Sequence, residues 1–386
     1  MNFIRGAKHL NHNTPIKGYK TSVLQAYGWN EQWEKKAAEA AAEHHQARAL
    51  VPARVTAQFS HVYRVMTNEG ERLGTVAGRY QYEASGKGDY PAVGDWVMAE
   101  LAPGDERVVI HALLPRQSAV SRKVAGSQWQ EQVIGANIDF LFLVIALNQD
   151  FNLRRIERYL TAAMGSCAQP VIVLTKADLC PNPEEMAEQT RAFIPASVPA
   201  VVVSAMNGEG REHLAPYLGQ GVTVAVAGSS GAGKSTLLNW LSEADRMRVQ
   251  DIREDDAKGR HTTTHRELFP IAGGALLMDT PGMRELQLWH ADEGHEEAFS
   301  DIAALAANCR YRDCRHEREE GCAVLAALAT GDLDRRRYNN YLKTGKEIAH
   351  QARKERIDQR SKERRSGASA GKPRQKVNHS RNWDEE

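Results

Sequence analysis

The sequence contains no long apolar run and few cysteines, and both absences exclude classes of protein. No apolar run reaches the roughly 20 residues that a membrane-spanning helix requires, and the N-terminus lacks the apolar core of a signal peptide. Only five of the 386 residues are cysteine, an odd number that argues for a reducing compartment. We therefore expect a cytoplasmic protein of two or three domains, with no membrane partner and no internal repeat.

Net charge is also scarce, because 50 Lys and Arg residues nearly balance 49 Asp and Glu residues. The balance hides a basic stretch near the C-terminus, which only Glu355, Asp358 and Glu363 interrupt. Its basic residues are Arg353, Lys354, Arg356, Arg360, Lys362, Arg364, Arg365, Lys372, Arg374, Lys376 and Arg381. We predict a disordered tail over residues 346–386, which either aids solubility or binds nucleic acid.

A glycine-rich segment after an apolar run is the strongest motif in the chain. Residues 222–227 lead into Gly228-Ser229-Ser230-Gly231-Ala232-Gly233-Lys234-Ser235-Thr236, and apolar residues then follow with helical spacing. A phosphate-binding loop requires this order of strand, loop and helix, because its glycines let backbone N–H groups converge on phosphate oxygens. We expect Lys234 to neutralise the β- and γ-phosphates and Ser235 to ligate Mg²⁺.

A second motif, Asp279-Thr280-Pro281-Gly282, follows another buried-strand pattern at 275–278. We expect Asp279 to hold Mg²⁺, directly or through water, and the Gly282 N–H to contact the γ-phosphate.

The segment Thr175-Lys176-Ala177-Asp178 follows the apolar run 171–174 and predicts the base. The Asp178 carboxylate matches the N1–H and exocyclic amine of guanine, and the Lys176 stem can cover the ring. Thr175 stands where most GTPases have Asn, which reduces its hydrogen bonding. The loop at Ser204-Ala205 adds backbone that can bind the guanine carbonyl, so GTP is favoured over ATP.

The base motif precedes the phosphate-binding loop, whereas an ordinary GTPase has the opposite order. The motifs are complete, so the order indicates a circularly permuted GTPase domain.

The catalytic residue is less directly indicated. Met283 occupies the position at which Ras-like GTPases orient water with Gln, so we expect slow intrinsic hydrolysis. His261 lies in 259–264, a segment typical of a switch, and is either a water-orienting residue or a solvated loop residue. Thr262 or Thr263 can add a hydroxyl ligand to Mg²⁺.

The cluster Cys309, Cys314, His316 and Cys322 predicts one structural Zn²⁺ site. Three thiolates and one imidazole suit a closed tetrahedral site, which leaves no position for a substrate. Nearby arginines make this module basic, which suits either solvent or a phosphate backbone.

The N-terminal third has a different pattern. We predict an extension over residues 1–50 with a helix from Glu31 to Leu50, and a basic linker over residues 115–123. Between them, short alternating runs at 53–59, 61–66, 74–78, 94–98 and 107–114 predict a small closed barrel. An OB-like barrel is the leading interpretation, and an SH3-like barrel or an inert spacer is the alternative.

The barrel, the permuted motifs and the Cys/His cluster, in that order, resemble the ribosome small-subunit-dependent GTPase A (RsgA) family over residues 51–345. The resemblance implies a multidomain fold: an OB-like β-barrel at 51–118, an α/β circularly permuted P-loop GTPase domain at 119–292, and an α-helical zinc-binding module at 293–345. Leu288-Trp289 is similar to the family as well.

The resemblance also implies a function. The expected protein is a GTPase that binds the small ribosomal subunit and its rRNA late in assembly, and that subunit stimulates hydrolysis. The resemblance assigns catalysis to His261, and Met283 matches the hydrophobic residue that the family has in place of Gln. We expect a monomer that uses GTP with Mg²⁺.

Two other function classes stay open. A GTPase that modifies RNA would need a second catalytic cluster, and the sequence outside the GTPase motifs suggests none. A GTP-gated RNA-binding module would show little turnover.

Overall fold

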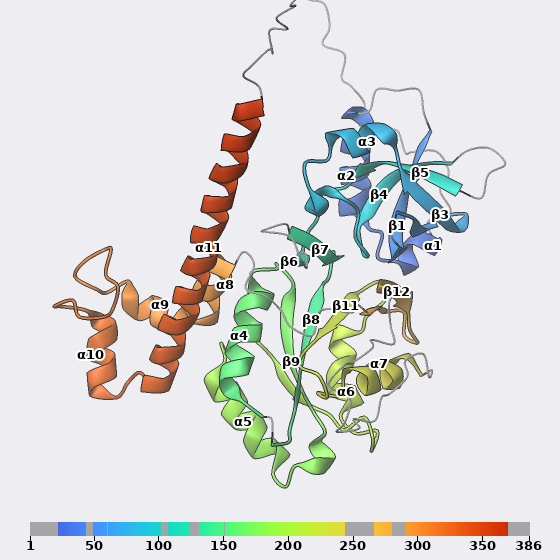
Figure 1. Ribbon diagram of the computed structural model, residues 1–386. Coiled ribbons are helices and arrows are strands. Elements are labelled where there is room, and N and C mark those ends of the chain that lie inside the picture. Colours follow the sequence, from blue (N-terminus) through green and yellow to red (C-terminus); the bar gives the residue numbers. More distant parts are fainter. Residues whose placement is uncertain are drawn as a thin grey trace, which may run out of the picture.

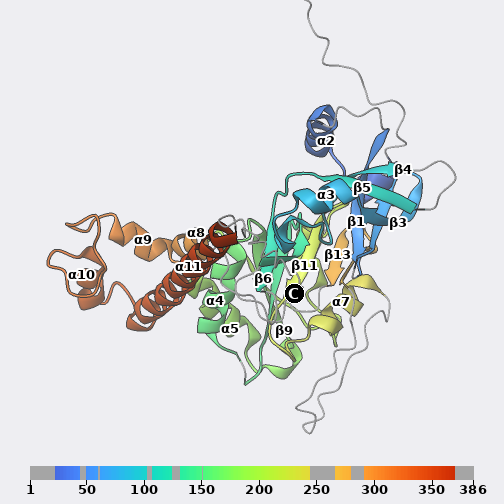
Figure 2. The ribbon, with the colours of Figure 1, turned by 45° about the horizontal axis from the view of Figure 1, so that its top comes forward.

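The computed structural model describes residues 22–43, 49–59, 61–101, 107–123, 131–149, 151–243, 266–279 and 291–369. A barrel, an α/β domain and a set of C-terminal helices follow one another along the chain, coloured blue to cyan, green to yellow and orange to red in Figure 1. The barrel and the C-terminal helices lie on different sides of the α/β domain (Figures 1 and 2).

Five strands form the barrel: β1 (Leu50–Gln58), β2 (Tyr63–Thr67), β3 (Gly70–Val76), β4 (Trp96–Leu101) and β5 (Arg107–Leu113). The strand order is β1-β2-β3-β5-β4, and pairing of β1 with β4 closes the sheet on itself. Alternate residues such as Val55, Val65 and Ile110 fill the interior, since neighbouring side chains of a strand point to opposite faces. Helix α3 (Gly78–Glu83) follows β3. The predicted OB-like barrel is therefore confirmed.

Two helices precede the barrel and pack on its outside: α1 (Ser22–Ala26) and α2 (Glu31–Glu43). Leu24 and Trp33 are buried against Trp96 of β4, and the rings of Trp29 and Trp96 lie 4.8 Å apart. The helix that we predicted to run from Glu31 to Leu50 ends earlier, at Glu43. Leu50 instead begins β1, because it pairs with Glu100 of β4.

The segment 115–123, predicted as a linker, is partly a strand. Strand β6 (Ala119–Lys123) pairs antiparallel with β7 (Glu131–Ala136). The Ser118 hydroxyl anchors this hairpin, since it accepts from the Ile138 N–H at 2.7 Å and donates to the Ile138 carbonyl at 2.7 Å.

The α/β domain is built on six strands: β8 (Phe140–Ala146), β9 (Gln169–Thr175), β10 (Ala200–Val202), β11 (Thr223–Ala227), β12 (Arg266–Pro270) and β13 (Leu276–Asp279). Their order is β10-β9-β8-β11-β13-β12, and all neighbours are parallel except β12 and β13. Helices cover both faces, which explains the nearly continuous apolar runs of the central strands. These helices are α4 (Leu153–Met164), α5 (Pro183–Phe193), α6 (Arg211–Leu214) and α7 (Lys234–Ser242).

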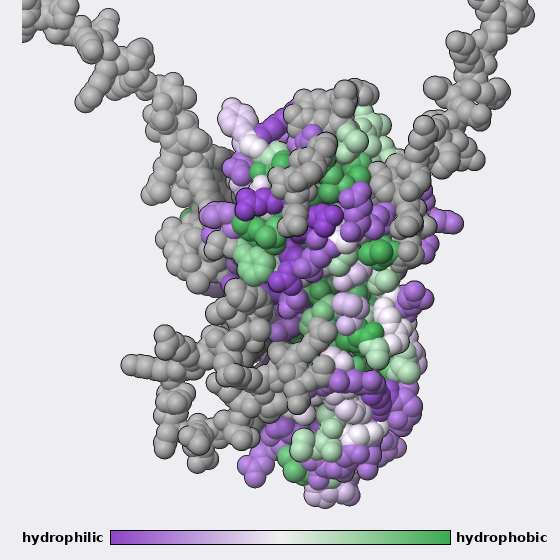
Figure 3. Space-filling model, turned by 90° about the vertical axis from the view of Figure 1, so that its right-hand side faces the viewer, coloured by the Kyte–Doolittle hydropathy of each residue, from purple (hydrophilic) through white to green (hydrophobic). Residues whose placement is uncertain are grey.

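The barrel and the α/β domain share one sheet. Strand β12 pairs antiparallel with β1, so that eleven strands form a single hydrogen-bonded series. Arg54 of β1 is 2 % exposed and reinforces the junction by donating to the Asn137 carbonyl at 3.1 Å and to Thr223 Oγ1 at 2.9 Å. Figure 3 shows the side of the molecule that lies on the right in Figure 1. This face is mainly hydrophilic, with scattered hydrophobic residues.

The C-terminal part is helical: α8 (Ala291–Ala298), α9 (Ser300–Ala306), α10 (Ala323–Thr330) and α11 (Arg335–Ser369). Helix α11 crosses the boundary expected at residue 345, so residues 346–369 are helical where we expected a disordered tail. Burial of Tyr338 and Ile348 fixes the first half of α11, and good helix formers continue it. None of the helices in the described ranges is long and apolar enough to cross a membrane.

Arg337 of α11 joins these helices to the α/β domain. Its guanidinium donates to Glu157 Oε1 on α4 at 2.7 Å and to both oxygens of Asp301 on α9 at 2.6 Å. Asn340 donates to the other Glu157 oxygen, and burial raises the pKa of Glu157 to about 7.

Candidate functional site

The predicted phosphate-binding loop has the backbone that such a loop needs. It joins β11 to α7, and Gly228, Gly231 and Gly233 have positive φ angles of 146°, 76° and 89°. A Cβ on Gly228 would lie 2.3 Å from the Val144 carbonyl oxygen of β8, so no other residue fits there. The loop ends at the N-terminus of α7, where the helix dipole favours an anion.

The Lys234 ammonium lies against this loop. Its Nζ donates to the Gly228 carbonyl at 2.8 Å and also to the Ser229 carbonyl. The ammonium is thus held beside the backbone that would surround a phosphate, and Ser235 and Thr236 follow it on the first turn of α7.

Thr175, the residue that departs from the usual Asn, contacts the phosphate-binding loop. It ends β9, is 4 % exposed, and donates through Oγ1 to the Ala232 carbonyl at 2.6 Å. The Ile145 carbonyl is farther away, at 3.3 Å, so the single hydroxyl proton favours Ala232. The threonine therefore keeps a bond between the predicted base motif and the loop, although the sequence suggested weaker bonding.

The two predicted base-binding segments are held together. Lys176 has a left-handed backbone with φ of 59°, and Asp178 Oδ1 accepts from the Ser204 hydroxyl at 2.7 Å. The same hydroxyl accepts from the Asn207 N–H at 3.2 Å, which fixes the turn that contains Ala205.

Asp279 ends β13, and β13 is the parallel neighbour of β11. The predicted residues therefore gather at the carboxyl ends of β9, β10, β11 and β13, where ligands bind in open α/β sheets. His261, Thr262, Thr263, Gly282 and Met283 lie outside the described residues, as does the pair Leu288-Trp289.

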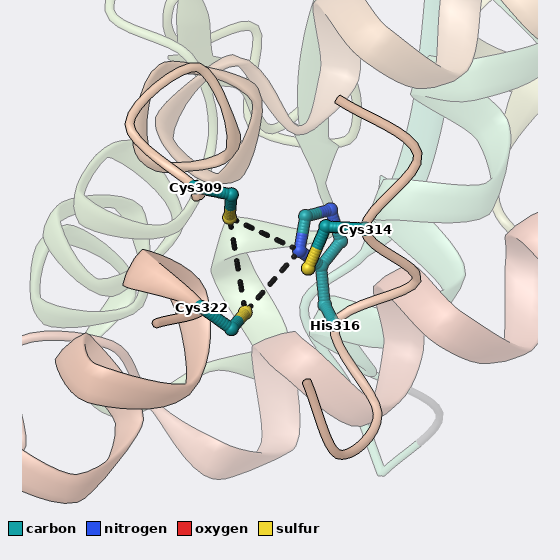
Figure 4. Close-up of side chains that lie close together, drawn as sticks. All are labelled: Cys309, Cys314, His316 and Cys322. Atoms are coloured by element: carbon teal, nitrogen blue, oxygen red, sulfur yellow. Dashed lines mark hydrogen bonds between the residues drawn. The ribbon is translucent and has the colours of Figure 1, made fainter. Parts of the chain in front are cut away.

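The four predicted zinc ligands form a second cluster (Figure 4). Their ligand atoms all lie within 4.8 Å of one another. Cys309 Sγ is 3.8 Å from Cys322 Sγ and 3.6 Å from His316 Nδ1, and His316 Nδ1 is 3.4 Å from Cys322 Sγ. A tetrahedral Zn²⁺ with bonds of ~2.3 Å separates its sulfur ligands by ~3.8 Å, so the donor set and spacing fit this ion.

The surroundings of the cluster also suit a metal. Burial lowers the pKa of His316 and so favours the neutral imidazole, which is the form that ligates metals. Burial raises the pKa of the Cys314 thiol to about 11, and a bound cation would reverse this by favouring the thiolate. The Tyr338 hydroxyl donates to the His316 carbonyl at 2.6 Å and ties the cluster to α11.

A phosphate-binding loop that follows a guanine-type base motif, on a sheet shared with a small barrel, defines a circularly permuted GTPase-like fold. A family model described as RsgA GTPase matches residues 113–289. Together with the relatives below, this match shows that the chain belongs to the RsgA GTPase family.

Curated relatives agree over most of the chain. "Small ribosomal subunit biogenesis GTPase RsgA" of Opitutus terrae is 45% identical over 345 residues, which cover 86% of this chain and 91% of the relative. The protein of the same name from Xanthomonas axonopodis pv. citri is 43% identical, with coverage of 91% and 94%.

Solved structures have a similar fold. YjeQ from Thermotoga maritima aligns with a TM-score of 0.58 and 25% identity, covering 78% of this chain and 99% of that chain. YloQ, described as a circularly permuted GTPase, aligns with a TM-score of 0.56 and 26% identity, covering 80% and 98%.

Proposed function

We propose that this chain hydrolyses GTP and acts on the small ribosomal subunit during its late assembly. The observation that carries the proposal is the convergence of Asp178, Ser204, Lys234 and Asp279 at one edge of the sheet, in a chain whose relatives are named small ribosomal subunit biogenesis GTPases. The barrel and the basic C-terminal module would contact rRNA. We propose a cytoplasmic monomer.

In the proposed mechanism, the loop Gly228–Thr236 and Lys234 bind the phosphates, and Asp178 selects guanine. Ser235 and Asp279 would hold Mg²⁺, which neutralises charge on the β- and γ-phosphates. The hydroxyl of Thr262 or Thr263 would add a ligand to Mg²⁺, and the Gly282 N–H would contact the γ-phosphate. His261 would orient the attacking water, because Met283 has no group that can do so.

Zn²⁺ has a structural role in this proposal. Cys309, Cys314, His316 and Cys322 would fill all four positions of a tetrahedral ion, leaving none for a substrate. The ion would fix the loop that carries the ligands against α10 and α11.

The test is the rate of GTP hydrolysis by the full-length protein alone, with small subunits and with large subunits. We expect slow hydrolysis alone and strong stimulation by the small subunit only. Equal stimulation by both subunits would contradict the assignment of the partner. GTP and RNA binding without turnover under any condition would replace the proposal with a GTP-gated RNA-binding module.

The assignment of His261 has its own test, subunit-stimulated hydrolysis by His261→Ala. We expect the stimulated rate to fall by about 100-fold or more while GTP affinity stays within about twofold of wild type. An unchanged stimulated rate would move the catalytic role to an RNA group.

A further inference from the structure

Four side chains occupy one row across four adjacent strands at the junction of barrel and α/β domain. Arg64 of β2 pairs with Ala57 of β1, Ala57 pairs with Glu267 of β12, and Glu267 pairs with Asp279 of β13. We refer to Arg64, Ala57, Glu267 and Asp279 as the junction row. It extends from the barrel to the residue that the proposed function places on Mg²⁺.

An ion pair spans the first part of the junction row. Arg64 NH1 donates to Glu267 Oε1 at 2.9 Å, passing over Ala57, whose methyl group leaves room for the long side chain. The Arg64 guanidinium also lies over the Phe59 ring, 5.7 Å from its centroid, and its Nε is 3.4 Å from Glu71 Oε1. Arg64 is therefore fixed by the barrel while its charge neutralises a carboxylate of the α/β domain.

The second part of the row places two carboxylates side by side. Residues directly opposite on antiparallel strands point to the same face, with Cβ atoms roughly 5 Å apart. The neighbouring pairs follow this rule, since Phe269 and Leu277 share one core and Leu268 and Met278 share the other. Glu267 and Asp279 consequently lie on one face, where like charges repel unless a cation offsets them.

We infer that Arg64 is a positioning residue for the nucleotide site, acting through Glu267 on the electrostatic potential at Asp279 and hence on the affinity for Mg²⁺. This inference rests on the proposed function, which assigns Mg²⁺ to Asp279. Arg64 belongs to the barrel. The barrel therefore contributes a charge to the nucleotide site, in addition to the residues of the GTPase motifs. Withdrawal of Arg64 makes the metal site more negative, and removal of the Glu267 charge makes it more positive.

The measurement is the equilibrium affinity of the full-length protein for a fluorescent GDP analogue, with Mg²⁺ and with a chelator in its place. The ratio of the two affinities is the magnesium enhancement. Arg64→Ala should raise this enhancement about threefold, and Glu267→Gln should lower it about threefold. These values are expected for partly screened charges that lie on strands near that of Asp279. The double variant should return to the wild-type value.

Glu71→Ala is the matched control, because it removes the other carboxylate partner of Arg64 but lies outside the junction row. It should leave the enhancement at the wild-type value, as should Arg64→Lys, which keeps the charge. Thermal unfolding of every variant checks the fold. If Arg64→Ala does not fold, Arg64→Gln replaces it: a raised enhancement supports the role of Arg64, and an unchanged one overturns it.

The two failures are distinguishable. A wild-type protein whose GDP affinity does not respond to Mg²⁺ contradicts the proposed function itself. A wild-type enhancement that neither Arg64→Ala nor Glu267→Gln changes overturns the role of Arg64 and leaves the proposed function standing.

Discussion

At the residue scale, Thr175 shows how one hydroxyl can join two nucleotide-binding segments. Its bond to the Ala232 carbonyl links the end of β9 to the phosphate-binding loop. Thr175→Val keeps the shape of the side chain but leaves a buried carbonyl without its donor, which costs about 1–3 kcal/mol. We expect GDP affinity to fall about tenfold, as measured by fluorescence titration, with little change in far-UV circular dichroism.

Two substitutions serve as controls for that experiment. Thr175→Ser keeps the hydroxyl and should retain most of the affinity, whereas an equal loss in Thr175→Ser would mean that packing and not the hydrogen bond is responsible. Thr175→Asn, the residue that most GTPases carry, should also bind nucleotide.

At the residue level, the sequence alone predicts a site where the interacting residues lie within one short motif. The spacing of Gly228, Lys234 and Asp178 indicated the loop and the base motif, because these residues act within short segments. The contacts of Thr175 with Ala232 and of Arg64 with Glu267 could not be predicted, since they depend on which strands are neighbours and in what register.

At the element scale, α11 is joined to the α/β domain by a titratable contact. Burial raises the pKa of Glu157 from 4.5 to about 7, despite the opposing effects of Asn340 and Arg337. Because the folded-state pKa lies above the unfolded value, the stability from this group is complete below about pH 4.5 and is lost as pH rises through about 7.

Glu157→Gln should therefore flatten the dependence of stability on pH in that window. Between about pH 4.5 and pH 7, Glu157 alone should change the free energy of unfolding of the wild type by at most about 3 kcal/mol. Urea unfolding at a series of pH values measures it. Asp301→Asn is the comparison. Burial raises the pKa of Asp301, but the hydrogen bond and charge of Arg337 outweigh it, so that the pKa is lowered. The effect of Asp301 on stability therefore lies at lower pH. Identical slopes in wild type and Glu157→Gln would refute this account.

The Cys/His cluster is a second feature of the C-terminal elements. Cys322 caps α10, since its sulfur accepts from the Leu325 N–H at 3.4 Å, so loss of the metal should loosen this helix. We expect Cys309→Ser to reduce bound zinc from about one ion per chain to almost none and to lower the melting temperature. Elemental analysis and calorimetry measure both quantities.

Cys167→Ser is the control for the zinc measurement, because Cys167 is exposed and outside the cluster. Zinc content that is equal in the two variants would contradict the assigned ligands. The sequence predicted that these four side chains cluster because they lie within fourteen residues, from Cys309 to Cys322. The sequence did not predict how far α11 extends, because charged helix formers also suit a disordered tail.

At the scale of the whole molecule, the shared sheet should make the barrel and the α/β domain unfold together. Arg54 reinforces the junction from within, and burial lowers its pKa to about 10. Arg54→Met leaves the Asn137 carbonyl and the Thr223 hydroxyl without a donor, so we expect a loss of about 3 kcal/mol in the free energy of unfolding.

Two probes test whether unfolding is cooperative. In a background where Phe replaces the other four tryptophans, Trp129, Trp240, Trp289 and Trp383, the fluorescence of Trp29, Trp33 and Trp96 reports on the barrel. Release of a bound GDP analogue reports on the α/β domain. The two transitions should coincide in urea for the wild type and for Arg54→Met. Separate midpoints in the wild type would show that the junction does not couple the two parts.

The pairing of β1 with β12 also protects the protein from self-association. Strand β12 closes one side of the α/β sheet, and without β1 its N–H and C=O groups would be open to another chain. In this fold the barrel is the cover of that edge. A fragment that begins after the barrel would therefore expose β12 as an unpaired edge strand. Its tendency to aggregate would come from the loss of β1 and not from an unstable core.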